Sequence, residues 1–135
     1  MFDETTERFR GVIPMLVCAD PAAEIEFCKA AFGSAELSRR SGPDGSVVHA
    51  TLRIGDTLAM VHGVVPSLAS RAPDADGSSP VVIYIYVDDA YAVIERATVA
   101  GATVLMPPAR MPWGDHVGRI LSPSGHVWNV ASQSG

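Results

Sequence analysis

The sequence has few cysteines, an excess of acidic over basic residues and no long apolar run, and each shortage excludes a class of protein. Its two cysteines, Cys18 and Cys28, have no companion cysteine or histidine pair nearby, so they do not make a zinc signature, and we expect two buried, reduced thiols. Ten Lys and Arg stand against 15 Asp and Glu, giving a formal net charge of −5 without a basic run. This charge disfavours nucleic acid and anionic membrane surfaces as partners.

Targeting and membrane-spanning segments are missing as well. No apolar run approaches the roughly 18 residues that a bilayer span requires. The N-terminus, MFDETTER, is polar and acidic, which is typical neither of a secretory signal nor of a transit peptide. We therefore expect a cytoplasmic protein, and the length of 135 residues with 47% hydrophobic content suits one compact domain, residues 1–135.

Short strands and one helix make up the first half of the chain. The helix, 22–32, follows Asp20 and Pro21 as N-terminal signals and ends at Gly33. The alternation of apolar and polar residues, with Gly55-Asp56 as a hairpin turn, predicts the strands. These strands are expected at 12–18, 36–39, 47–54 and 57–61.

The same order of elements returns after a loop rich in Gly, Ser and Pro. Asp88-Asp89 precedes a helix at 90–100, and Gly101 ends it. Pro107-Pro108 and the residues through Gly114 are predicted as a loop. Strands are expected at 81–87, 102–106, 117–121 and 127–131.

The two halves form a tandem repeat. Asp20, Ile25 and Glu26 match Asp89, Ile94 and Glu95 at an offset of 69 residues, and Gly55 matches Gly125 at an offset of 70. We place module one at about 11–62, the loop at 63–80 and module two at about 81–133. Because each half alone leaves a sheet face uncovered, the repeat predicts two βαβββ half-sheets around a shared concave space, an α+β fold.

Three segments carry a family resemblance. They are D-x4-I-E-F-x-K-x-A-F-G at 20–33, DDAYAVIERATVAGATV at 88–104 and WGD…GRILSPSGHVWNVA at 113–131. They resemble the vicinal oxygen chelate superfamily, which includes glyoxalase I, extradiol dioxygenases, fosfomycin resistance enzymes and bleomycin resistance proteins, and within it the PhnB-like branch. The resemblance implies a cupped mixed sheet with helices on its convex face, often in a homodimer.

The same resemblance marks four positions where metal-using members carry His, Gln or Glu ligands. In this chain they fall on Ile13, Ala59, Val82 and Asn129. Aliphatic side chains offer no lone pair to a divalent ion, and a lone amide oxygen is a poor substitute. We therefore predict no metal cofactor at these positions.

Strand alternation selects the side chains that line the predicted cup. They combine two phenols, an imidazole, a guanidinium and an amide above an apolar floor, which is typical of small-molecule sites. Arg119 can clamp a carboxylate or phosphate, and His49 can act as a general acid or base. Most of the candidates also have a purely structural alternative. The tyrosines would pack on the sheet, the histidine would be an ordinary strand residue, the arginine would form a structural ion pair and the tryptophan would pack on the surface. The candidates are Met15, His49, Tyr84, Tyr86, Trp113, Arg119 and Asn129.

Three functions fit these features. The first is a small-molecule binding protein without the usual divalent metal. The second is a lyase, isomerase or dioxygenase-type enzyme, with His49 and Arg119 as catalytic candidates or with Zn, Ni, Mn or Fe held by unusual ligands such as His49, His62 or His116. The third is an interaction module whose cup is filled core. A homodimer is expected from the resemblance and from the need to cover sheet edges.

Overall fold

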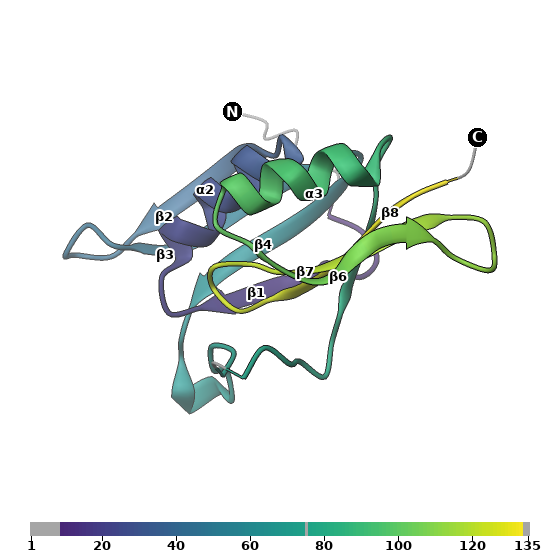
Figure 1. The fold of residues 1–135 in the computed structure, drawn as a ribbon. Coiled ribbons are helices and arrows are strands. Elements are labelled where there is room, and N and C mark those ends of the chain that lie inside the picture. Colours follow the sequence, from purple (N-terminus) through teal and green to yellow (C-terminus); the bar gives the residue numbers. More distant parts are fainter. Residues whose placement is uncertain (1–8, 75, 134–135) are drawn as a thin grey trace.

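The computed structural model describes residues 9–74 and 76–133 and contains two repeats of one strand and helix order (Figure 1). The four strands of the first repeat form one sheet in the order β1-β4-β3-β2, which we call sheet 1. In it β1 runs parallel to β4, whereas β4 is antiparallel to β3 and β3 is antiparallel to β2. Its elements are β1 (Met15–Cys18), α2 (Pro21–Phe32), β2 (Ala35–Ser41), β3 (Val47–Ile54) and β4 (Thr57–Gly63).

The second repeat has the same topology and forms sheet 2, in the order β5-β8-β7-β6. Its elements are β5 (Ile83–Tyr86), α3 (Ala90–Val99), β6 (Thr103–Arg110), β7 (His116–Leu121) and β8 (Val127–Ser132). Two open, mixed four-stranded sheets with one helix each confirm the predicted α+β fold of tandem βαβββ units.

The helices begin where the sequence places their capping residues. Asp20 accepts a hydrogen bond from the Ala23 N–H at 3.2 Å, and the chain leaves α2 through Gly33 at a left-handed φ of 67°. Asp89 caps α3 by accepting from the N–H groups of Tyr91 and Ala92. These caps satisfy amide groups that have no partner inside the helix.

One predicted loop is wrong: β6 continues through Pro107-Pro108 to Arg110. The strand lies at the edge of sheet 2, beside β7 alone, so only one of the two consecutive proline nitrogens is on the side where β7 could accept a hydrogen bond. The pairing with β7 shifts register between Met106 and Ala109, which accommodates them. The ribbon therefore extends to the turn that carries Trp113.

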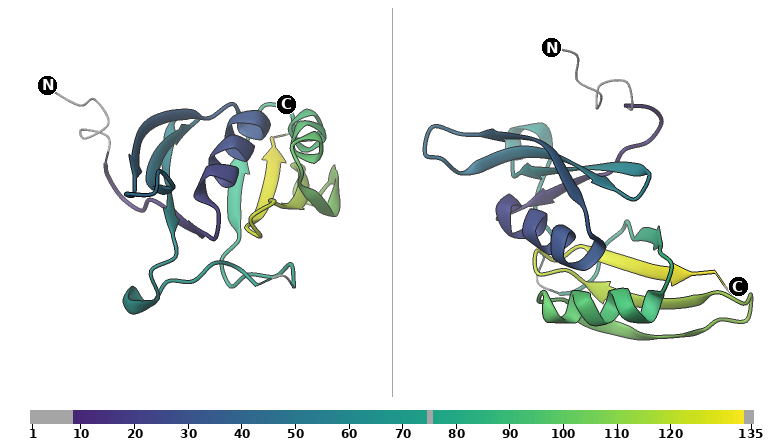
Figure 2. Two further views of the ribbon diagram at one scale, coloured as in Figure 1. Left: turned by 90° about the vertical axis from the view of Figure 1, so that its left-hand side faces the viewer. Right: turned by 90° about the horizontal axis from the view of Figure 1, so that it is seen from above.

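A single cluster of buried apolar side chains joins the two repeats. Figure 2 shows α2 between the two sheets, and α2 also contacts α3. Phe32, at the end of α2, packs on Trp128 of β8 with ring centroids 4.7 Å apart. Cys18 and Cys28 are fully buried free thiols, and burial raises the pKa of Cys18 to about 12, so both cysteines behave as core residues, as expected.

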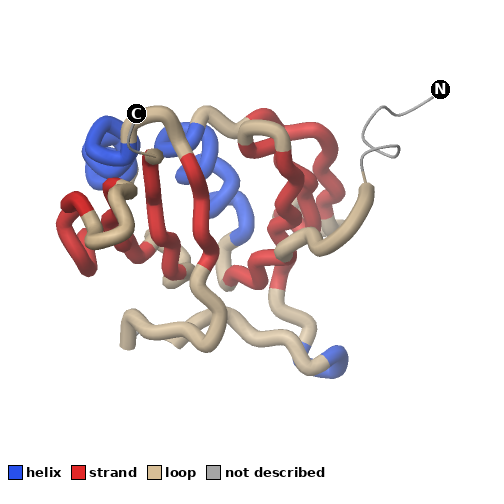
Figure 3. The backbone as a smooth tube through the Cα atoms, turned by 90° about the vertical axis from the view of Figure 1, so that its right-hand side faces the viewer, coloured by secondary structure: helices blue, strands red, loops and turns tan. Residues whose placement is uncertain are grey.

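The connection between β4 and β5 runs along one end of both sheets (Figure 3). It contains a short 3-10 helix, Pro66–Leu68. Farther along, it packs on the β7–β8 turn: a Cβ added at Gly125 would lie 3.0 Å from the Pro73 Cβ. The segment thus contacts sheet 2 as well as linking the repeats.

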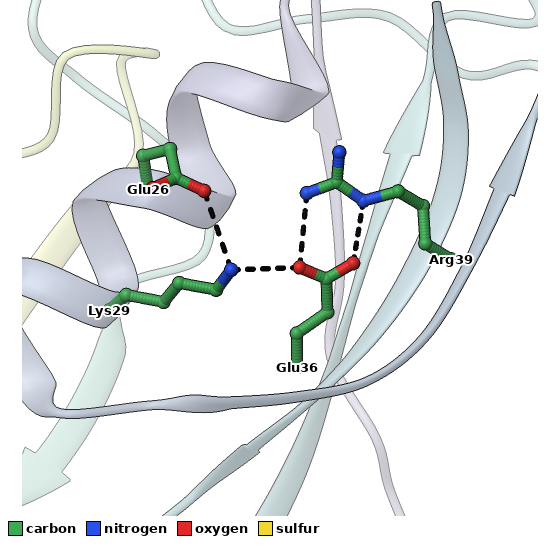
Figure 4. Close-up of polar contacts among 4 residues, drawn as sticks. All are labelled: Glu26, Lys29, Glu36 and Arg39. Carbon is green, nitrogen blue, oxygen red and sulfur yellow. Dashed lines mark hydrogen bonds and ion pairs between the residues drawn. The ribbon is translucent and has the colours of Figure 1, made fainter.

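An ion-pair cluster fixes α2 to β2 (Figure 4). Lys29 Nζ lies 2.8 Å from Glu36 Oε1 and 3.4 Å from Glu26 Oε2. Arg39 donates to both carboxylate oxygens of Glu36. These cations lower the pKa of Glu36 to about 2, first through the Arg39 hydrogen bonds and then through Lys29.

Over the stretches 9–74 and 76–133, no helix combines the length and the apolar character that a membrane crossing would need.

Candidate functional site

Each sheet has one face packed on a helix and one face turned away from it, which we call its open face. On sheet 1, the core face carries Ala50, Leu52, Ala59 and Val61. Because successive side chains of a strand point to opposite faces, the residues between them, which include His49, Thr51, Met60 and His62, lie on the open face. On sheet 2, Ile120, Trp128 and Val130 belong to the core. The open face of sheet 2 carries Tyr84, Tyr86, Val117, Arg119, Asn129 and Ala131.

Tyr84, Asn129 and Arg119 form a row across β5, β8 and β7 on the open face of sheet 2. Tyr84 pairs with Asn129 on the parallel neighbour β8, and Asn129 pairs with Arg119 on β7. Arg119 donates from Nε to Asn129 Oδ1 at 2.7 Å. Asn129 is buried and Arg119 half-buried, so the amide holds the guanidinium in place.

Two neighbouring phenols, one of them in this row, lie on β5 with their rings tilted at 33°. The rings of Tyr84 and Tyr86 have centroids 5.6 Å apart, and the side chains are 46% and 55% exposed. The Tyr86 hydroxyl donates to Asp115 Oδ2 at 2.9 Å, and this hydrogen bond is the main cause that raises the pKa of Tyr86. Trp113 lies two residues away from Asp115 in the β6–β7 turn and is exposed.

Sheet 1 carries a histidine pair on its open face. His49 of β3 is directly opposite His62 of β4, and their Nδ1 atoms are 2.9 Å apart. Burial, followed by the charges of His62 and Arg40, lowers the pKa of His49. His49 is therefore mostly neutral at neutral pH and is able to accept a proton.

The structure corrects one of the four family ligand positions. Ala59 faces the core, where it pairs with Leu52 as Trp128 pairs with Ile120 in sheet 2. The next pair along the strands lies on the open face and is Thr51–Met60 in sheet 1 and Arg119–Asn129 in sheet 2. Met60 is therefore the residue that matches Asn129. Met60 offers only a soft thioether. Within the described parts of the chain, no group of three or more His, Cys, Asp or Glu is placed to hold a metal ion.

The seven predicted site residues divide between the two sheets. Met15 and His49 lie on sheet 1, and the remaining five lie on sheet 2 or in its β6–β7 turn. Because α2 lies between the sheets and covers the inner face of sheet 1, the open face of sheet 1 points away from sheet 2 (Figure 2). One chain therefore does not bring His49 opposite Arg119. When the two repeats are compared, the position of Arg119 in sheet 2 corresponds to that of Thr51 in sheet 1 and not to that of His49.

Two cavities contain members of the predicted set. Met15 lines a cavity of about 820 Å³ between β1, β5 and the connection that precedes β5, together with Arg71 and His126. Tyr84 and Tyr86 line another, of about 830 Å³, against the β3–β4 turn and α3, together with Arg96. His126 Nε2 lies 2.9 Å from the Val17 carbonyl oxygen and so links the β7–β8 turn to β1.

Two residues that contact the predicted site residues are not apparent from the sequence. His62 was left just beyond the predicted strand at 57–61, although the two-residue Gly55-Asp56 hairpin turn sets residue 49 opposite residue 62. The contact between Tyr86 and Asp115 spans 29 residues and depends on the length of the β6–β7 ribbon, which the proline pair concealed.

Comparison with known proteins agrees with this architecture. The family model for the Glyoxalase/Bleomycin resistance protein/Dioxygenase superfamily matches residues 12–130. The chain belongs to this superfamily, which confirms the resemblance at that level; its assignment to the PhnB-like branch stays a prediction.

Several relatives show how widely the fold is shared. An uncharacterized protein of Mycobacterium bovis is 40% identical over 120 residues, which cover 87% of this chain and 79% of the relative. The crystal structure of TioX from Micromonospora sp. ML1 superposes with a TM-score of 0.69 at 24% identity, covering 93% and 98% of the two chains. An Arabidopsis thaliana gene product gives a TM-score of 0.72 at 25% identity, covering 91% and 98%.

Proposed function

We propose that the protein binds a small, anionic molecule with an aromatic ring on the open face of sheet 2, without a divalent metal at the positions that metal-using relatives employ. The observation that carries the proposal is the row Tyr84–Asn129–Arg119, in which a buried amide holds a guanidinium next to exposed phenols. Membership of a superfamily that includes bleomycin resistance proteins is compatible with a binding role.

Arg119 supplies the charge selection. Its Nε is occupied by Asn129, so the Nη edge of the planar group is the part that can donate in parallel to a carboxylate or phosphate. Preorganisation by Asn129 reduces the side-chain entropy that binding would otherwise cost. A lysine could not reproduce this geometry, because its ammonium is a point charge on a flexible chain.

Tyr84 and Tyr86 supply the surface for an aromatic ring. Their neighbouring rings, half exposed on an edge strand, offer an amphipathic surface on which an aromatic ligand can pack. The hydrogen bond to Asp115 orients the Tyr86 ring. Trp113 is near enough to Asp115 in the chain to cover the mouth of such a site from the β6–β7 turn.

A second copy of the chain would complete the cup. Since the open faces of sheets 1 and 2 point in different directions within one chain, a cup that uses both requires sheet 1 of one copy to face sheet 2 of another. Met15, Tyr84 and Tyr86 are large apolar or aromatic residues left exposed on these faces, which supports such an association. His49 and Arg119 would then come from different copies.

The enzyme hypothesis has one observation in its favour, the neutral His49 beside His62. If the protein is a lyase or isomerase, His49 is the base. A bound compound incubated with the protein would then be converted, as followed by mass spectrometry, and His49→Gln would abolish the conversion while retaining binding.

The test of the binding proposal is a calorimetric titration with a panel of aromatic carboxylates and phosphates and with their uncharged amide or alcohol analogues. We expect at least one anion to bind and its uncharged analogue to bind at least about tenfold more weakly. Arg119→Ala should remove binding, whereas Arg71→Ala, which removes an exposed arginine paired with Asp74, should not. Equal binding by wild type and Arg119→Ala would overturn the proposal. Light scattering in parallel gives the mass, for which we expect a dimer.

A further inference from the structure

The two histidines of sheet 1 meet in a way that neither the fold nor the proposed binding site explains. His49 and His62 stand directly opposite each other on adjacent strands, both half-buried on the open face. Their Nδ1 atoms are 2.9 Å apart, and the rings are inclined at 67°. At this distance one Nδ1 must carry a proton and the other must accept it through a lone pair, so the pair holds one shared proton.

This spacing is close to what a metal ion requires of two cis ligands. Imidazole nitrogens bind Zn²⁺ at about 2.0–2.1 Å, so two nitrogens that subtend about 90° at one ion lie about 2.9 Å apart. In the present arrangement the two nitrogens point toward each other. A moderate rotation about each Cβ–Cγ bond, a torsion with a broad energy minimum, would turn both lone pairs toward a common point outside the sheet.

We propose that His49 and His62 together bind one divalent transition-metal ion through their Nδ1 atoms. The ion takes the place of the hydrogen bond between the rings: the ring that carried its proton on Nδ1 carries it on Nε2 instead, so both imidazoles stay neutral, and water or a donor atom of a bound molecule completes the coordination. Imidazole ligands select Ni²⁺, Cu²⁺ or Zn²⁺ rather than Mg²⁺ or Ca²⁺.

The surroundings of the pair are compatible with this assignment. Arg40 is opposite His49 on β2 and is exposed, so its charge can move away from an entering cation. The pair occupies positions on β3 and β4 other than Met60, which stands at one of the family ligand positions, and it does not depend on Arg119 or on the proposed aromatic ligand.

The test is a calorimetric titration of the untagged, EDTA-dialysed protein with Ni²⁺, in the absence of any organic ligand. We expect about one ion per chain, and at least about tenfold weaker binding in His49→Ala and in His62→Ala. His116→Ala is the matched control, because it removes a half-buried imidazole on sheet 2 that contacts Tyr91, and its affinity should equal that of the wild type. Absence of binding to wild type, or an equal loss in all three variants, would overturn the proposal.

A second readout needs no variant and so does not depend on how the substitutions fold. The chain has four histidines, whose ring proton resonances are few enough to assign. Substoichiometric Ni²⁺ should broaden the signals of His49 and His62 before those of His116 and His126. Broadening of all four together, or of His116 and His126 first, would contradict the assignment. Failure of this site would leave the aromatic-anion proposal intact, because the two experiments share no residue.

Discussion

Replacing Glu24 with glutamine should stabilise the protein increasingly as the pH rises. Glu24 lies on α2 with 0% of its surface exposed, and among the described residues neither carboxylate oxygen has a hydrogen-bond partner. Burial raises its pKa above the ordinary value of 4.5, and His126, Ser122 and Ser124 oppose that rise only in part. The buried acid is thus protonated in the folded state at pH values where the unfolded chain has already ionised.

The magnitude follows from proton linkage. Between pH 4.5 and the raised folded pKa, the unfolded state binds fewer protons than the folded state, so the free energy of unfolding falls as the pH rises. Each pH unit in that interval costs about 1.4 kcal/mol, and two units cost about 2.7 kcal/mol, a large part of a typical total of 5–15 kcal/mol. Glutamine leaves a neutral amide in place of the acid and removes this slope.

The assay is urea unfolding of wild type and Glu24→Gln at pH values from 4.5 to 8. The two free energies should be similar near pH 4.5 and should diverge in favour of the variant above it. Glu26→Gln is the control, because Glu26 lies on the exposed side of the same helix and is 68% exposed. Parallel curves for wild type and Glu24→Gln would show that Glu24 is not a neutral buried acid and would refute the reasoning.

Three other substitutions test the packing, the capping and the surface charges. Gly118→Ala should destabilise the protein by about 1–3 kcal/mol in urea unfolding, because the new Cβ would overlap with Ile94 Cδ1 and would lie 3.0 Å from the Pro108 backbone nitrogen. Asp89→Ala should cost about 1 kcal/mol by removing the α3 cap, and Asp88→Ala, which caps nothing in α3, should cost less. Glu36 has a pKa of about 2 in the folded protein against an ordinary value of 4.5, so its stabilising contribution is present above pH 4.5 and is lost as the pH falls toward 2. The thermal midpoint should therefore fall less steeply between pH 4.5 and pH 2 in Glu36→Gln than in the wild type.

Local patterns were sufficient to predict most of the fold. The caps at Asp20 and Asp89, the stop at Gly33 and the hairpin at Gly55 each act within a few residues, and the structure has all four. The matching order of elements in the two halves then predicted the tandem repeat. The extent of β6 was wrong because the effect of a proline pair depends on whether the strand lies at a sheet edge, which is a property of the whole sheet.

The site was predictable one residue at a time but not as an arrangement. Alternation along single strands correctly set Tyr84, Arg119 and Asn129 on one face. The separation of His49 from Arg119 depends on how α2 packs between the sheets, and no periodicity along the chain carries that information. Glu24 was open to prediction, since it stands one position before Ile25 on the apolar side of α2, yet its isolation from partners appears only in the folded core.

The most direct test of the proposed site is to map the binding surface by NMR. The isotope-labelled protein would be titrated with an aromatic carboxylate found to bind by calorimetry, and with its amide analogue as the control. The account predicts that the carboxylate shifts the signals of Tyr84, Tyr86, Arg119 and Asn129, and that these shifts disappear in Arg119→Ala. Shifts confined to other parts of the chain, or shifts at sheet 2 that persist in Arg119→Ala, would contradict it.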